Sequence, residues 1–76
     1  MKDILEVVIK NLVDNQDAVS ITEKLDAKSI CYEVKVAKED MGKVIGKQGK
    51  MAKAIRSIMK AIATKEHKKV NVEFLD

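Results

Sequence analysis

The sequence predicts a small α+β domain in which three helices pack on one face of a three-stranded mixed sheet. Three observations indicate this fold class. Apolar residues recur at the helical period near the N-terminus and again after residue 50, and they alternate with polar residues in three other segments. A chain of 76 residues has room for one core. We therefore expect one domain over residues 1–76.

The first helix is expected over residues 3–13, DILEVVIKNLV. Asp3 and Glu6 have the spacing of a capping box, and the polar stretch 14–17 would end the helix. The residues expected on its apolar face are Ile4, Leu5, Val8 and Leu12. This face would pack on the sheet.

A hairpin is expected next, because residues 19–25 and 30–36 both alternate apolar and polar residues and a short polar stretch separates them. Only Glu23 interrupts the apolar series of the first strand. The residues expected to face the core are Val19, Ile21, Leu25, Ile30, Tyr32, Val34 and Val36. The opposite, polar face would stay hydrated.

From Ala37 the period becomes helical. Glu39 and Asp40 suit the start of a short helix, which reaches Gly42 within about one turn. A longer amphipathic helix is expected over residues 50–65. Its apolar face is expected to comprise Met51, Ile55, Ile58 and Ile62. Its polar face is expected to comprise Lys50, Lys53, Ser57 and Lys60.

The third strand is expected over residues 70–74, VNVEF, which alternate apolar and polar residues. The helical segments that separate it from the second strand form a crossover of the length that parallel pairing requires. The strand over residues 30–36 would therefore lie in the centre of the sheet. Met41, Met51 and Met59 are expected to fill gaps in the core.

Basic residues are concentrated in one part of the chain. Residues 41–69 contain nine Lys or Arg and one acid, a net charge of +8, whereas the whole chain carries +3. A surface of one sign favours a polyanionic partner. A solvated helix face would also collect lysines. That alternative applies in particular to Lys60, Lys65, Lys68 and Lys69.

All three glycines lie between the two C-terminal helical segments, at Gly42, Gly46 and Gly49. Their spacing excludes a Walker-type phosphate loop and a dinucleotide-binding fingerprint. Gly42 has a simpler explanation as the end of the short helix. Residues 46–49 are expected to form a tight turn whose glycines adopt left-handed dihedrals and let a sugar-phosphate chain approach the backbone.

The flanks of this turn complete a predicted binding site for a sugar-phosphate chain and its bases. Lys47 and Lys50 lie beside the N-terminus of the long helix, whose free NH groups and dipole favour a phosphate. Val44 and Ile45 would offer apolar surface next to the bases. Because the chain has one Tyr and one Phe, stacking platforms are few. We therefore expect backbone and phosphate contacts to dominate, and affinity to fall as salt rises.

The segment VIGKQG, followed by KMAKAI, resembles the signature of the KH domain, a Gly-x-x-Gly module that binds single-stranded nucleic acid. The order helix-strand-strand-helix-helix-strand is that of the type II KH fold. Over essentially all 76 residues, including VAKEDMGKVIGKQGK and VNVEFLD, the chain is similar to the KhpA family of small bacterial single-KH proteins.

The resemblance implies RNA as the ligand. The residues that it implies in RNA binding are Lys43, Val44, Ile45, Gly46, Lys47, Gln48, Gly49, Lys50 and Lys53. It further implies a homodimer, or a heterodimer with a larger KhpB-like multidomain KH protein. An RNA-chaperone role and an influence on cell elongation and cell-wall homeostasis are also implied by the resemblance alone.

No catalytic, cofactor or metal site is predicted. The single histidine, His67, lies in the basic segment without a suitable Ser, Cys or acid, so we expect no enzyme. The single cysteine, Cys31, cannot form an internal disulfide, which favours a reducing cytoplasm, and no apolar run is long enough to span a membrane. One alternative to RNA binding stays open: a protein-interaction module that docks on a partner or on itself.

Overall fold

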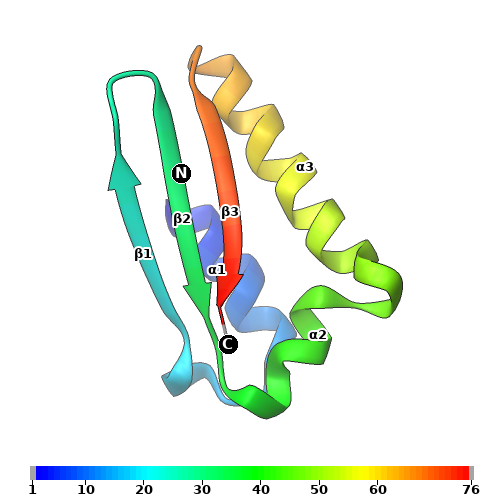
Figure 1. The fold of residues 1–76 in the computed structure, drawn as a ribbon. Coiled ribbons are helices and arrows are strands. Elements are labelled where there is room, and N and C mark those ends of the chain that lie inside the picture. Colours follow the sequence, from blue (N-terminus) through cyan, green and yellow to red (C-terminus); the bar gives the residue numbers. More distant parts are fainter. Residues whose placement is uncertain (1, 76) are drawn as a thin grey trace.

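The computed structural model describes residues 2–75 and contains the six expected elements in the expected order (Figure 1). The helices and strands are α1 (Lys2–Leu12), β1 (Ser20–Leu25), β2 (Ser29–Lys35), α2 (Met41–Ile45), α3 (Lys50–Lys65) and β3 (Lys69–Leu75). Short 3-10 turns, which the sequence patterns did not indicate, cover Gln16–Ala18, Lys38–Asp40 and Lys47–Gly49. The predicted α+β fold class is confirmed.

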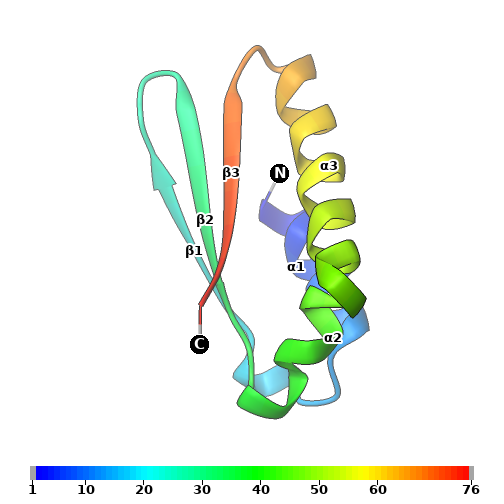
Figure 2. The same cartoon turned by 45° about the vertical axis from the view of Figure 1, so that its right-hand side comes forward.

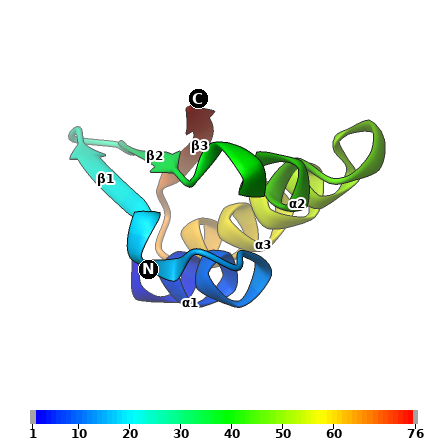
Figure 3. The same ribbon diagram turned by 90° about the horizontal axis from the view of Figure 1, so that it is seen from below.

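The sheet has the strand order β1-β2-β3. β1 pairs with β2 in antiparallel orientation, and β3 pairs with β2 in parallel orientation, so Tyr32 lies between Glu23 on one side and Val72 on the other. All three helices lie on one side of the sheet (Figure 2). From below, α1 and α3 lie beneath the sheet and the segment between α2 and α3 projects from the side of the molecule (Figure 3).

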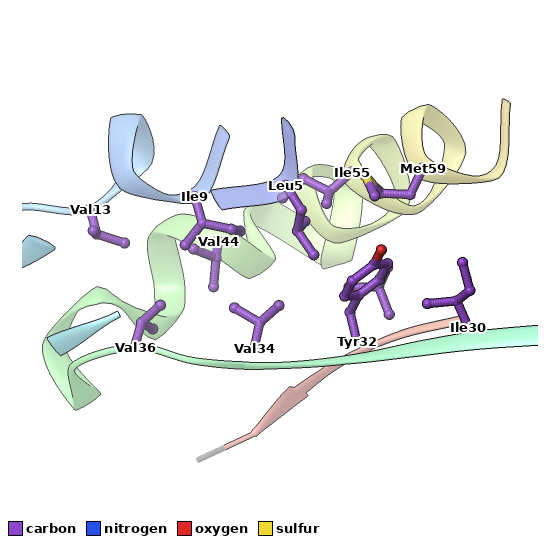
Figure 4. Close-up of a cluster of buried hydrophobic side chains, with 11 residues drawn as sticks. Leu5, Ile9, Val13, Ile30, Tyr32, Val34, Val36, Val44, Ile55 and Met59 are labelled. Atoms are coloured by element: carbon purple, nitrogen blue, oxygen red, sulfur yellow. The ribbon is translucent and has the colours of Figure 1, made fainter. Parts of the chain in front are cut away.

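The core lies between this helix layer and the central strand (Figure 4). Every second residue of β2 and its extension is buried, as predicted: Ile30, Tyr32, Val34 and Val36. From the helices, Leu5, Ile9, Val44, Ile55 and Met59 meet them. Met59 is fully buried, which agrees with its predicted role as a core residue, whereas Met41 and Met51 pack at the margin.

Three residues predicted to face the core are exposed. Ile4 is 45% exposed and Ile58 is 47% exposed, because the helices turn other residues inward. In α1 the fully buried residues are Leu5 and Ile9, and in α3 they include Ala52 and Ala63. The inner face of α3 combines these alanines with Ile55 and Met59, and alanine on that face lets the helix approach the sheet closely.

The third of these residues, Leu25, is 68% exposed. It ends the edge strand β1 next to the hairpin turn, where its neighbour across the strand pair is Ile30. An edge strand has a neighbour on one side only, so its last residue has fewer side chains to pack against. The alternating pattern therefore predicted the face correctly but not the burial.

Asp3 does not cap α1 as predicted, whereas Asp40 lies at the start of α2 as predicted and has a further role. α1 already begins at Lys2, so Asp3 lies within the first helical turn and is not an N-terminal cap. The carboxylate of Asp40 makes no capping hydrogen bond to α2. It is fully buried and accepts hydrogen bonds from the backbone NH groups of Asp14 (3.3 Å) and Asn15 (3.0 Å). Asp40 thus ties the end of α1 to the start of α2.

Candidate nucleic-acid interface

Both glycines of the turn between α2 and α3 have positive φ, as predicted, but only Gly49 lies in the left-handed helical region. Gly46 and Gly49 both have φ of +75°, and Gln48 between them has φ of 56°. The Gly46 NH group donates to the carbonyl oxygen of Gly42 at 2.9 Å, and the Gly49 NH group donates to that of Gly46 at 3.3 Å. The turn is thus held by its own backbone, with residues Lys47 and Gln48 exposed at its tip.

The two glycines are required for different reasons. A Cβ atom on Gly46 would lie 2.7 Å from the Cβ atom of Met51 and 2.9 Å from its backbone nitrogen. The space beside Gly46 is therefore filled by the first turn of α3 and not left open for a ligand, as the sequence-based explanation assumed. A Cβ atom on Gly49 would meet nothing within 4 Å. Only Gly49 leaves room for a close approach from outside.

Four of the predicted RNA-binding residues form one exposed basic surface. Lys47 and Gln48 lie on the turn, Lys50 is the first residue of α3, and Lys53 follows one turn later. None of the three lysines forms an ion pair within residues 2–75. No acidic residue lies in the first turn of α3, so the positive end of its helix dipole is not offset there.

Lys43 differs from these lysines because its charge is compensated within the protein. Its ammonium group contacts the carboxylate of Asp14 and lies 3.5 Å from Oδ1 of Asp40. The Asp14 carboxylate, and more weakly Asp40, raise the pKa of Lys43 above its ordinary value. A phosphate at this position would have to displace a carboxylate that is already bound.

The two apolar residues before the turn, Val44 and Ile45, differ in exposure. Val44 is fully buried in the core, so it can support a binding groove from below but cannot touch a base. Ile45 is half-buried and stays available at the surface.

Gly42 is the second residue of α2 and therefore does not end that helix. It is exposed, and a Cβ atom there would meet nothing within 4 Å, so the surface of α2 is open to close contact.

The side chain of Arg56 on α3 reaches the edge strand β3. The sequence patterns did not assign this residue a separate role. Its Nε–H donates to the carbonyl oxygen of Val72 on β3 at 3.0 Å, and its guanidinium lies 5.4 Å from the ring centre of Phe74. The contact shows that the side of α3 carrying Lys53, Arg56 and Lys60 is turned toward β3. A basic series with spacings of three and four in a helix could have indicated this side.

Two hollows have linings that include lysines, one between the end of β2 and the start of α2 and the other between the end of α3 and the start of β3. One, of about 560 Å³, is lined by Lys35, Val36, Lys38 and Met41 at the start of α2. The other, of about 370 Å³, is lined by Lys60, Thr64, Lys68, Lys69 and Val70 at the end of α3. Both combine lysines with apolar side chains, which suits an anionic ligand with an apolar part.

The described residues hold no group of three or more histidine, cysteine or acidic side chains arranged to bind a metal ion. None of the helices in the described part of the chain is both long and apolar enough to cross a membrane. Cys31 is a free thiol on the outer face of β2.

The chain is similar to known proteins over its whole length. A family model described as KhpA/KhpB, KH domain, matches residues 2–74. The RNA-binding protein KhpA of Clostridium perfringens is 55% identical over 75 residues, which is 99% of this chain and 100% of the relative. The proteins of the same name in Clostridium acetobutylicum and Listeria monocytogenes are 56% identical (99% and 100% of the two chains) and 42% identical (100% of both). No solved structure matches the chain significantly.

Proposed function

The chain belongs to the KhpA/KhpB KH-domain family, and from this premise we propose that it binds single-stranded RNA through the turn at residues 46–49. Its relatives named above are called RNA-binding proteins and none is named as an enzyme, in agreement with the expectation of no catalytic activity. We extend the proposal to one KH domain over residues 1–76, acting in the cytoplasm. The observation that carries it is the exposed, uncompensated basic tip of this turn.

The RNA backbone is the part of the ligand that the turn would hold. Gly49 leaves the turn open from outside, and the NH groups at the start of α3 point toward a phosphate placed there. Lys47, Lys50 and Lys53 add positive charge without competing carboxylates. Gly-x-x-Gly turns of this kind clamp about four nucleotides. Lys43 would contribute only if RNA displaced Asp14 from it.

The bases would lie on the strand side of the turn. Ile45 and the open backbone at Gly42 supply an apolar floor on α2. Tyr32 is fully buried and the Phe74 ring is covered by Arg56, so neither offers a free stacking surface. Affinity then depends mainly on phosphate contacts, which makes it modest for one copy and strongly dependent on salt.

A protein-interaction role is supported by exposed apolar side chains on the helix layer. Ile4 and Val7 on α1, and Ile58 on α3, are all exposed. We propose that this surface pairs with a second copy or with a KhpB-like protein. Pairing would raise RNA affinity through effective concentration. An RNA-chaperone role, with effects on cell elongation and cell-wall homeostasis, is part of the same proposal.

Two variants separate the roles. Lys47→Asp combined with Gln48→Asp reverses the charge of the turn, and Ile58→Asp places a charge on the apolar surface. RNA binding and molar mass in solution are measured for both. We expect the turn variant to lose RNA binding while its molar mass in solution stays that of the wild type. We expect Ile58→Asp to have a lower molar mass in solution, because it no longer pairs, while one copy still binds RNA weakly. Full RNA binding by the turn variant would contradict the proposal.

A further inference from the structure

The hollow of about 370 Å³ is lined by residues from the last turns of α3 and the start of β3. This end of α3 is the one far from the turn at residues 46–49 (Figure 1). Its lining residues are Lys60, Thr64, Lys68, Lys69 and Val70. The three lysines come from both sides of a chain reversal, and no acidic residue lines the hollow. Within the described residues, none of these lysines takes part in an ion pair. The hollow thus has positive charge without an internal counter-ion.

The backbone holds two of these lysines in position. α3 ends in a Schellman motif, in which the Lys68 NH group donates to the Ala63 carbonyl at 2.9 Å and the His67 NH group donates to the Thr64 carbonyl at 3.1 Å. His67 has φ of 59°, a conformation that glycine usually supplies at this point. Lys69 then begins β3. The reversal that carries both lysines is therefore fixed by hydrogen bonds.

The end of a helix carries partial negative charge, which opposes anion binding. Here the carbonyl oxygens of Ala63 and Thr64 already accept hydrogen bonds from the Schellman motif, and that of Lys60 accepts one from the Thr64 hydroxyl at 2.8 Å. The remaining dipole is equivalent to roughly half a unit charge. Three ammonium groups outweigh it, so the hollow attracts an anion.

We infer that this hollow binds a backbone phosphate of the same RNA strand whose other end is held at residues 46–49, an inference that rests on the proposed function. Lys53, Arg56 and Lys60 lie on the side of α3 that faces β3, and they connect the turn to the hollow with positive charge. From Gly49 to Thr64 the helix covers about 22 Å. The bound RNA is then longer than the roughly four nucleotides that the turn clamps.

The test compares a short and a long RNA. Fluorescence anisotropy is measured with oligouridylates of about four and about twelve nucleotides, lengths within the range of single-strand binding sites. The variant carries Lys60→Gln, Lys68→Gln and Lys69→Gln. A charge-matched control carries Lys2→Gln, Lys24→Gln and Lys65→Gln, which remove three exposed lysines that do not line the hollow. Circular dichroism checks that both fold.

The wild type is expected to bind the long RNA more tightly than the short one. The variant is expected to lose about tenfold in affinity for the long RNA and about 0.7 in the salt slope, the value for one phosphate on a single strand, with binding of the short RNA unaffected. The control is expected to keep most of the length dependence. Equal affinity of variant and control for the long RNA would overturn the second phosphate site and leave the proposed function intact. A wild type that binds neither RNA would overturn both.

Discussion

The Nε–H of Arg56 on α3 donates to the carbonyl oxygen of Val72 on β3 at 3.0 Å. β3 is an edge strand of the sheet. It pairs with β2 on one side, and its other side is free and lies next to α3 (Figure 2). Arg56 therefore joins the long helix to the free edge of the sheet and also adds charge to the side of α3 that faces it. Arg56 thus contributes both to the stability of the fold and to the charge of the proposed RNA-binding surface.

Replacing Arg56 should separate these two contributions. Arg56→Met keeps the aliphatic stem but loses the hydrogen bond and the charge, so we expect the free energy of unfolding to fall by about 1 kcal/mol and RNA affinity to fall severalfold. Arg56→Lys keeps the charge without the Nε–H donor and should retain more RNA binding at a similar loss of stability. Urea unfolding and RNA titration measure the two effects. Unchanged stability of Arg56→Met would contradict this role.

The two turn glycines should respond differently to the same substitution. Gly46 has φ of 75° and ψ of 176°, a region that only glycine populates readily, and its Cβ position is blocked by Met51. Gly49 has left-handed helical dihedrals and free space. We expect Gly46→Ala to lower the free energy of unfolding by about 3 kcal/mol and Gly49→Ala by about 1 kcal/mol. Equal losses in urea unfolding would show that the Met51 contact is unimportant.

Asp40 should make the fold sensitive to acid. The backbone NH group of Asn15 holds the pKa of Asp40 below its ordinary value, with help from Asp14 and Lys43. A lowered pKa in the folded state stabilises the fold above the ordinary carboxyl pKa of about 4, and this contribution disappears as the pH falls through the folded pKa.

Asp40→Asn should therefore lower the melting temperature at pH 7 and flatten its decline in acid. The amide would also place an NH₂ group against two NH donors. Asp17→Asn serves as the control, because Asp17 is an exposed carboxylate near the same end of α1. Thermal unfolding between about pH 7 and about pH 2 measures the effect. The prediction fails if both variants follow the wild-type acid profile.

The buried hydroxyl of Tyr32 should contribute nothing to stability. The side chain is fully buried, and among the described residues its oxygen has no hydrogen-bond partner. Figure 4 shows it directed toward the helix layer. Because a buried hydroxyl without a partner is unfavourable, we expect Tyr32→Phe to leave the free energy of unfolding unchanged or raise it by about 1 kcal/mol. A loss of stability in urea unfolding of Tyr32→Phe would contradict this prediction.

Tyr32 should also determine the response to alkali. Burial, and secondarily the carboxylate of Glu23, raise the pKa of Tyr32 above its ordinary value. The unfolded chain loses this proton near pH 10 while the folded chain keeps it, so the fold loses stability as the pH rises further. Tyr32→Phe should lack this part of the alkaline decline in thermal unfolding. Identical alkaline profiles would contradict it.

The sequence predicted the elements, their order, the central strand and the positive φ of the two turn glycines, because each leaves a local pattern. It did not predict the positive φ of Gln48. Which residues of a helix face the sheet depends on how the helix packs, and the local pattern does not determine this. Ala52 and Ala63 face the sheet together with Ile55 and Met59, whereas Ile58 does not. The contacts of Gly46 with Met51 and of Lys43 with Asp14 depend on how segments pack together in three dimensions. Neither can be derived from spacing alone.

The most direct test of the central claim is RNA binding by the wild type and by the variant with Lys47→Asp and Gln48→Asp. Anisotropy of a labelled single-stranded RNA is measured at about 50 and about 200 mM salt. We expect wild-type binding to weaken as salt rises, and the variant, correctly folded by circular dichroism, to bind at least about tenfold more weakly. Equal binding by a folded variant would mean that RNA does not use the turn at residues 46–49.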